Sequence, residues 1–346
     1  TLLIAGVLFA CLSGIIFAED YVYYGTVMPV NPARSLGGVA LKPNGDIYYV
    51  TFANPDSALG YISNAIPGCL TSTYSADIIT TESAFTDGGR GLNDVELDAD
   101  GNIYISGTGA TAASTVLKKF SAAPAHAQVW TSNDIRHNGI AIISADVLAI
   151  AEAWNRISWK KTSDGTAEGT AFVSGGTSYG RSLAFNSQNN DIYVGRNGDN
   201  KLSALKVFSG GSSSNLSGYA LALDEQLPTL GVQTAFGVAT QALDYDEINN
   251  QLIAADVQDQ GSIDLLQGVR IYDITGTGAT TVFTQAQYFD GTAIPGRTLQ
   301  YLNVYGVSYA QIGGVDYIAI GASTGTEFVI DILSRGGASV GTWDLY

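Results

Sequence analysis

Short apolar stretches alternate with tight polar turns along most of the chain, and one pattern recurs six times. Each copy contains an apolar strand, a polar turn, a second apolar strand, a short loop and a third strand. Asn, Asp or Gly occupies the first turn of each copy, as hairpin turns require. The six copies begin with GGVAL, NDVEL, NGIAI, RSLAF, TQALDY and YGVSYA.

The second strand of each copy is rich in β-branched and aromatic residues, as in 47–50, 103–105, 192–194 and 317–320. A fourth strand follows several third strands, in SADIIT, AQVWTS, GTAFVS and ATTVFTQ. A period of roughly 45 to 65 residues is typical of propeller blades, which bury both faces by stacking in a ring. The pattern therefore predicts an all-β, six-bladed β-propeller over residues 21–346.

The ends of the chain are expected to close this ring. Residues 21–30 (YVYYGTVMPV) and 341–346 (GTWDLY) are both strand-like and belong to no complete repeat. We expect both to complete the terminal blade. A doubly wound α/β fold is disfavoured because no amphipathic helices separate the strands, and a two-sheet sandwich would not need six similar units.

The opening, TLLIAGVLFACLSGIIFAED, differs from everything that follows it. Eighteen residues without a charge precede Glu19 and Asp20, so we predict a short apolar helix over residues 1–20. Such a helix must pack against lipid or against copies of itself. The residues expected to form this contact are Leu2, Leu3, Ile4, Val7, Leu8, Phe9, Leu12, Ile15, Ile16 and Phe17.

Three kinds of segment fit this opening: an export signal, a membrane anchor and a filament helix. An export signal carries a basic region before its apolar part, and none is present; a lipoprotein signal would be cut before Cys11. The segment resembles the apolar helix that prepilin-type processing leaves on type IV pilins, although Ala5 stands where those proteins commonly carry Glu. The filament helix is our first interpretation, and the anchor and the unprocessed signal stay open.

Composition and net charge limit the classes of molecule that the protein is expected to bind. Only 14% of residues are charged, and the net charge of −16 disfavours nucleic acid and anionic membrane surfaces. Low charge with 41 glycines suits a protein outside the cell or on its surface. Cys11 and Cys69 are interpreted as unbridged thiols, with Cys69 in a loop, and no zinc-binding spacing is present.

Three short motifs are candidates for a calcium-binding, cation-binding or glycosylation site. LDADGN resembles the start of a calcium loop at Asp98 and Asp100, but it lacks the downstream Glu and falls where a hairpin turn is predicted. The acidic stretch 256–264 could hold a cation such as calcium. Asn215-Leu216-Ser217 fits the pattern of an N-glycosylation acceptor.

Two repeats carry a family resemblance. HNGIAIISADVLAIAEAWNRISWKKTSDGTAEG in the third repeat resembles the blade signature of the gluconolactonase/regucalcin family and its strictosidine synthase relatives, and GRGLNDVELDADGNIYISGT in the second is similar to that family. The resemblance implies a six-bladed propeller. It also implies the metal site of that family's hydrolases, in which a Glu, an Asn and an Asp hold one divalent metal on the propeller axis.

Only part of that metal site can be carried over. Asn138 matches the middle Asn, but Leu36 or Gly37 stands where the Glu belongs, and Arg181 stands where the Asp belongs. The resemblance also implies substrate contacts at Asn93 and Asp94, with Arg90 nearby. A neutral Asn does not hold a hard divalent ion without carboxylates. The alternative is that these polar residues line the central channel as caps of the inner strands.

Taken together, the residues favour a non-enzymatic extracellular structural protein. We expect a propeller displayed on an apolar N-terminal helix, self-associating as the subunit of a pilus-like filament. The alternative is a periplasmic or secreted gluconolactonase-like, metal-dependent hydrolase with a degraded site. A propeller that binds a glycan or protein at its loop face is a third hypothesis.

Overall fold

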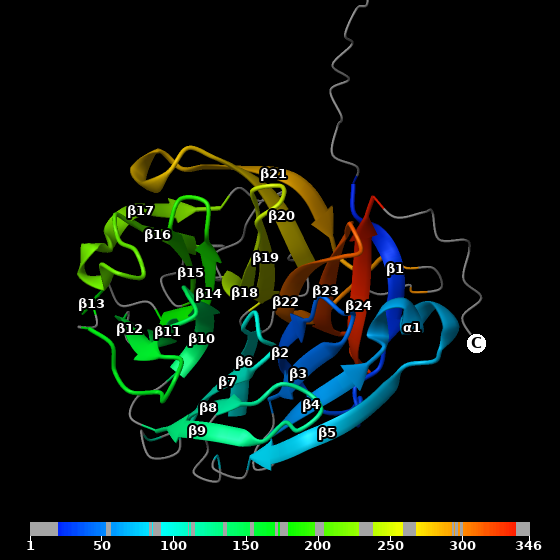
Figure 1. Cartoon of the computed structure of the whole chain (residues 1–346). Helices are drawn as coiled ribbons and strands as arrows, with labels where there is room; N and C mark the ends of the chain where they lie inside the picture. The colour runs from blue at the N-terminus through cyan, green and yellow to red at the C-terminus, as the bar shows by residue number, and fades with distance from the viewer. Residues whose placement is uncertain are drawn as a thin grey trace, which may run out of the picture.

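Six antiparallel sheets of four strands each form a ring around a central axis (Figure 1). The fold confirms the expected six-bladed β-propeller. The computed structural model describes residues 20–52, 57–82, 85, 91–109, 111, 115–133, 137–152, 156–169, 172–173, 179–197, 204–227, 238–258, 268–292, 294, 297 and 300–336.

Blades 1 to 5 each use four consecutive strands, ordered from the axis outward. Blade 1 contains β2 (Leu36–Leu41), β3 (Ile47–Thr51), β4 (Ser57–Ser63) and β5 (Ser75–Glu82). Blade 2 contains β6 (Gly91–Leu97), β7 (Ile103–Thr108), β8 (Val116–Phe120) and β9 (Gln128–Ser132). Blade 3 contains β10 (His137–Ile142), β11 (Val147–Glu152), β12 (Arg156–Lys161) and β13 (Phe172–Val173). Blade 4 contains β14 (Tyr179–Asn186), β15 (Asp191–Asn197), β16 (Ala204–Ser209) and β17 (Ala220–Gln226). Blade 5 contains β18 (Val238–Asp246), β19 (Gln251–Gln258), β20 (Gly268–Thr275) and β21 (Val282–Phe289).

Blade 6 combines the two ends of the described chain. It contains β22 (Asn303–Ile312), β23 (Val315–Ser323), β24 (Phe328–Arg335) and, as its outermost strand, β1 (Val22–Val27). β1 pairs antiparallel with β24, so that Tyr23 lies opposite Leu333 and Val27 opposite Ile330. The prediction that residues 21–30 close the ring is confirmed for β1, and residues 341–346 lie outside the described residues.

A separate hydrophobic cluster fills the space between every pair of neighbouring blades in the described chain. Adjacent residues of the second strands serve opposite neighbours, because successive side chains of a strand point to opposite faces. In β3, Tyr49 packs toward blade 6 while Tyr48 packs toward blade 2. Both faces of each blade are therefore buried, which explains why these strands are apolar throughout.

The expectation of a loop around Cys69 was wrong. A short helix, α1 (Ala65–Thr71), lies there between β4 and β5, and it packs beside β1. The helix is interrupted by a kink at Ile66, whose backbone is extended (φ −119°, ψ 116°), and Pro67 follows directly, where the first turn of a helix tolerates proline. Ala65 and Ile66 are buried in the cluster between blades 6 and 1, which holds the segment against the propeller.

The predicted N-terminal helix cannot be compared with the structure, because residues 1–19 lie outside the described residues. α1 is the single α-helix of the described chain, and two 3-10 turns occur at Leu216–Gly218 and Gly278–Thr280. No helix in the described part is long and apolar enough to cross a membrane.

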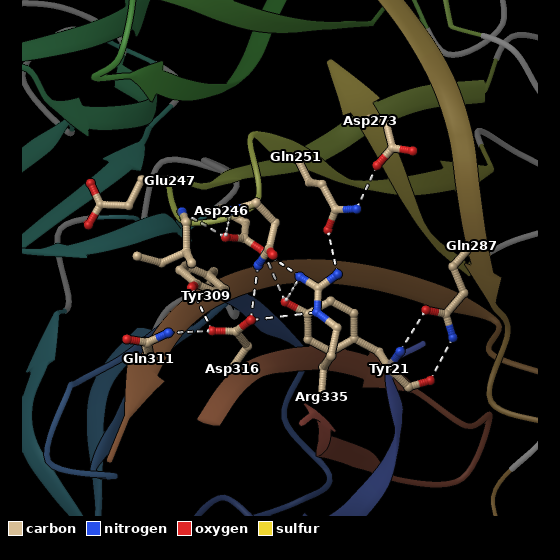
Figure 2. Close-up of polar contacts among 12 residues, drawn as sticks. Tyr21, Asp246, Glu247, Gln251, Asp273, Gln287, Tyr309, Gln311, Asp316 and Arg335 are labelled. Carbon is tan, nitrogen blue, oxygen red and sulfur yellow. Dashed lines mark hydrogen bonds and ion pairs between the residues drawn. The ribbon is translucent and has the colours of Figure 1, made fainter. Parts of the chain in front are cut away.

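A buried polar cluster joins the start of the chain to blades 5 and 6 (Figure 2). We call Tyr21, Asp246, Asp316 and Arg335 the ring-closure cluster. Arg335 Nη2 donates to Asp246 Oδ2 at 2.7 Å, and its guanidinium lies 4.1 Å from the centre of the Tyr21 ring. Arg335 Nε lies 3.5 Å from Asp316 Oδ2. Asp246 is fully buried and Arg335 is only 7% exposed, so the ion pair has little contact with water.

Hydrogen bonds between the Tyr21 backbone and the Gln287 side chain strengthen this connection between the blades. Tyr21 N donates to Gln287 Oε1 at 2.9 Å, and Gln287 Nε2 donates back to Tyr21 O at 2.6 Å. Because Gln287 belongs to β21, the residue just before β1 is tied to the outermost strand of blade 5 as well as to blade 6. Tyr21 therefore takes part in closing the ring, together with β1.

Candidate functional site

A break in strand register occurs near the start of all six innermost strands, which line the axis. Such bulges turn side chains away from regular strand positions and often occur near functional sites. The residues at these breaks are Gly37, Asn93, Asn138 with Gly139, Arg181, Gln241 and Tyr305. Three of the residues singled out from the sequence thus occupy equivalent places in their blades.

The two asparagines act as links between blades. Asn93 Nδ2 donates to Thr108 Oγ1 at 2.9 Å and to His137 O at 3.2 Å. Asn138 Nδ2 donates to Gly180 O at 2.7 Å, while Thr108 Oγ1 donates to Asn138 Oδ1 at 3.1 Å. These bonds connect blades 2, 3 and 4, and both side chains are more than nine-tenths buried.

Asp94 makes a similar link with its carboxylate. Its Oδ1 accepts from Val95 N and its Oδ2 from Ile140 N, each at 2.9 Å. On its other side lies Gly38, whose missing Cβ would stand 3.0 Å from Asp94 Cα. Glycine at 38 therefore lets the innermost strands of blades 1 and 2 approach closely.

The remaining sequence candidates differ in their surroundings. Leu36 is fully buried in the hydrophobic cluster between blades 6 and 1, and Gly37 carries no side chain. Arg181 lies half-buried at the break in β14. Arg90 and residues 259–264 of the acidic stretch 256–264 lie outside the described residues.

A cavity of about 450 Å³ opens at the other end of the innermost strands. We call it the axial funnel. It is formed by the ends of β2, β6, β18 and β22 and by the turns that follow three of them. Its charged lining residues are Lys42, Glu96, Asp98, Asp100, Asp244 and Glu247. The funnel is thus strongly acidic, with one lysine at its wall.

Three carboxyl groups of the innermost strands influence one another along the axis. Asp244 Oδ1 accepts from Tyr245 N at 2.7 Å, and its Oδ2 accepts from Tyr309 N at 2.6 Å. Burial raises the pKa of Asp94 to about 7 and that of Asp244 to about 6, and the charge of a neighbouring aspartate adds to both shifts. Burial, with the charges of Asp244 and Asp94, also raises the pKa of Glu96 well above its ordinary value.

This arrangement can exchange protons near neutral pH and can accept a cationic group. Carboxyls with raised pKa values are frequent at functional sites, although structural clusters show them as well. No group of three or more His, Cys, Asp or Glu side chains within the described ranges is arranged to hold a metal ion. The hydrogen bonds of Asp94 and Asp244 show a structural use for both.

The LDADGN motif is a hairpin turn, as expected. Asp98 Oδ1 accepts from Asp100 N at 3.1 Å and from Asn102 N at 2.8 Å. Asp98 Oδ2 accepts from Asn102 Nδ2 at 2.8 Å and from Tyr104 Oη at 3.0 Å. The carboxylate is thus occupied by its own turn between β6 and β7.

Sequence reasoning missed Glu96, Asp244 and Arg335. A signal was present for the first two, since a carboxylate inside an apolar first strand marks a side chain that faces the axis, as in NDVEL and TQALDYD. Arg335 gave no such signal because its partners lie 19 to 314 positions away.

By its fold the chain is a six-bladed β-propeller protein. Comparisons with known proteins support this fold and identify no family. No family model matches it, and no curated protein does. It is similar to a catalytically inactive virginiamycin B lyase from Staphylococcus aureus, solved with quinupristin, at 13% identity and a TM-score of 0.51, covering 90% of this chain and 88% of that one. It is also similar to a putative oxidoreductase (glucose dehydrogenase) from Thermus thermophilus, at 11% identity and a TM-score of 0.54, covering 91% and 99%. At such identities the likeness shows the propeller fold alone.

Proposed function

We propose that this chain is a non-enzymatic extracellular surface protein, attached through its apolar residues 1–18 to copies of itself in a pilus-like filament. One observation carries the proposal. Three residues after Ala18, the last residue of the uncharged stretch, the chain enters the ring closure at Tyr21, which is 3% exposed and hydrogen-bonded to blades 5 and 6. The apolar segment is therefore followed at once by a residue that is bonded to two blades.

This joint suits a segment that carries load. A pull on residues 1–18 would reach β1 and pass into β24 through their antiparallel hydrogen bonds. The ion pair between Arg335 and Asp246 would hold the same point from inside.

The sequence of the segment favours contact between copies. In an α-helix, Gly6, Ala10 and Gly14 would recur at four-residue intervals on one face. Small residues at this spacing let apolar helices approach closely. Eighteen residues are also near the lower limit for spanning a bilayer, which favours a helix bundle over a lone anchor.

The contacts at the axis do not favour the hydrolase alternative. Asn138, which matches the middle metal ligand of the gluconolactonase family, uses both amide atoms to link blades 2, 3 and 4. The positions that should supply carboxylates hold Gly37 or Leu36 and Arg181. The proposed role therefore assigns these residues to the integrity of the ring.

Electron microscopy and sedimentation of the full chain test the proposal. We expect filaments from the native chain, and their loss in a Leu8→Glu/Leu12→Glu variant, because buried charges would separate the helices. A Val129→Glu/Leu221→Glu variant is the matched control. It adds the same two charges at exposed positions of outer strands β9 and β17, so filaments should persist.

Two outcomes would refute the filament. A native chain that stays monomeric without detergent would remove any need for association. A chain that binds lipid vesicles as a monomer, and loses binding in the Leu8→Glu/Leu12→Glu variant, would establish the membrane anchor instead.

A further inference from the structure

The turn between β16 and β17 carries the one Asn-x-Ser/Thr tripeptide of the sequence, Asn215-Leu216-Ser217. Ser212 and Asn215 exchange backbone hydrogen bonds of 3.3 and 3.0 Å, which close a tight turn. A 3-10 turn over Leu216–Gly218 follows at once. The tripeptide therefore stands in ordered backbone at the edge of blade 4.

Side chains of this segment alternate between the core and the surface. Leu216 packs against the cluster between blades 3 and 4, and Tyr219 is buried there with its ring 5.3 Å from that of Trp159. Asn215 and Ser217 are exposed. The two apolar residues thus anchor the segment, while the two polar members of the tripeptide face solvent.

One hydrogen bond engages the Asn215 side chain. Ser217 Oγ donates to Asn215 Oδ1 at 3.2 Å, and Asn215 Nδ2 donates to no acceptor among the described residues. Gly218 contributes by its small size, since a Cβ there would stand 2.5 Å from Asn215 Nδ2. The hydroxyl therefore engages the amide oxygen and leaves the amide nitrogen available.

We propose that Asn215 is an N-glycosylation site of this protein. Asn215 Nδ2 would form a bond to the anomeric carbon of an oligosaccharide carried on a lipid phosphate or diphosphate. The bond from that carbon to the phosphate oxygen breaks, the lipid phosphate leaves with the electron pair, and the amide nitrogen loses one proton. The inference rests on the proposed extracellular location, because such transfer occurs on exported chains.

The position is compatible with the proposed filament. The turn lies at the far left of the ring in Figure 1, whereas β1, next to the proposed attachment segment, lies at the right. Blade 4 is separated from blade 6 by blade 5. A glycan on Asn215 would therefore extend into solvent away from β1.

Peptide mass spectrometry of the protein purified from its native cells tests the site. We expect most copies of the peptide containing Asn215 to carry an added sugar mass. Asn215→Gln and Ser217→Ala, expressed in the same cells, should lose that mass completely, whereas Ser217→Thr should keep it. Equal melting temperatures of the variants without their glycans would exclude misfolding as the cause.

Labelling of intact cells with a membrane-impermeant amine reagent separates the two hypotheses. A labelled protein with unmodified Asn215 would overturn the glycosylation site and leave the surface location standing. A protein that is neither labelled nor modified would overturn both. Sugar on another residue with none on Asn215 would also overturn the inference.

Discussion

Asp244 and Asp246 lie two residues apart on the same innermost strand, yet their surroundings are opposite. Asp246 is fully buried and pairs with Arg335 at 2.7 Å. Asp244 accepts hydrogen bonds from two backbone amides, but burial, together with the charge of Asp246, raises its pKa to about 6. The same residue type is thus a structural ion pair at one position and a destabilised charge at the other.

The presence of a cationic partner at Asp246 explains the difference between the two aspartates. Burial opposes charge at both positions, but an arginine from blade 6 compensates one carboxylate and no comparable group compensates Asp94, Glu96 and Asp244 in the described chain. The ring-closure cluster should therefore stabilise the fold at neutral pH, whereas the axial carboxyls should weaken it. Four measurements test this difference between the two groups of carboxylates.

The largest effect is expected from Arg335→Met. Removing the cation leaves the buried Asp246 without its charged partner, so the free energy of unfolding should fall by about 3–5 kcal/mol, measured by urea denaturation. Lys161→Met is the control. It breaks the exposed pair with Glu168 and should cost at most about 1 kcal/mol. Equal, small losses in both variants would show that the ring-closure pair is not a major stabilising contact.

The native protein should lose stability as the pH rises from 5 to 8. Carboxyls in the unfolded chain titrate near pH 4, whereas Asp94 and Asp244 titrate at about 7 and 6 in the folded chain. The folded state therefore binds more protons than the unfolded state in this range, and each unit of rising pH lowers the free energy of unfolding. For these two carboxyls we expect a loss of about 4 kcal/mol between pH 5 and pH 8, measured by urea denaturation. A flat or rising profile would contradict the raised pKa values.

Asn138→Ala should destabilise the ring by about 1–2 kcal/mol, because Gly180 O and Thr108 Oγ1 lose a buried partner. Thermal unfolding measures the loss. Gln128→Ala, at an exposed position of β9, should leave the transition unchanged. A stable Asn138→Ala protein would remove the structural role proposed for this residue and reopen the ligand role that the family resemblance implies.

The smallest effect is expected from Glu96→Gln. The change keeps the shape of the side chain and removes one negative charge beside Asp94 and Asp244, so stability at pH 8 should rise by about 1 kcal/mol. The gain should be smaller at pH 5 than at pH 8, since burial and the neighbouring carboxylates raise the pKa of Glu96 and more of the native carboxyl is neutral at the lower pH. Asp146→Asn, at an exposed turn, is the control and should change stability at neither pH. A loss of stability at pH 8 would show that the charged form of Glu96 is needed.

The candidate site could be predicted only in part. Asn93, Asp94 and Asn138 were found from a motif, and the structure places all three near the register breaks of neighbouring innermost strands. Their contacts could not be foreseen, because each depends on the backbone of the next blade. Glu96 and Asp244 lie on different blades, and only closure of the ring brings their charges together.

α1 shows the same limit at the level of secondary structure. Pro67 and Gly68 have low helix propensity inside a helix, and the chain does kink at Ile66, directly before Pro67. The helix forms where Ala65 and Ile66 can be buried between blades 6 and 1. That surface exists only after β1 has joined β24.

The repeated alternation of apolar strands and polar turns was sufficient to determine the class of fold, the number of blades and, within residues 21–30, the closing role of β1. These features depend on local periodicity and on burial of both faces of each blade, which a sequence records directly. The pairing of Arg335 with Asp246, the crowding of axial carboxyls and the links through Asn93 and Asn138 required the folded ring. Each of them joins residues far apart in the chain, and electrostatic interactions depend on distance and burial in space, which the order of residues does not specify.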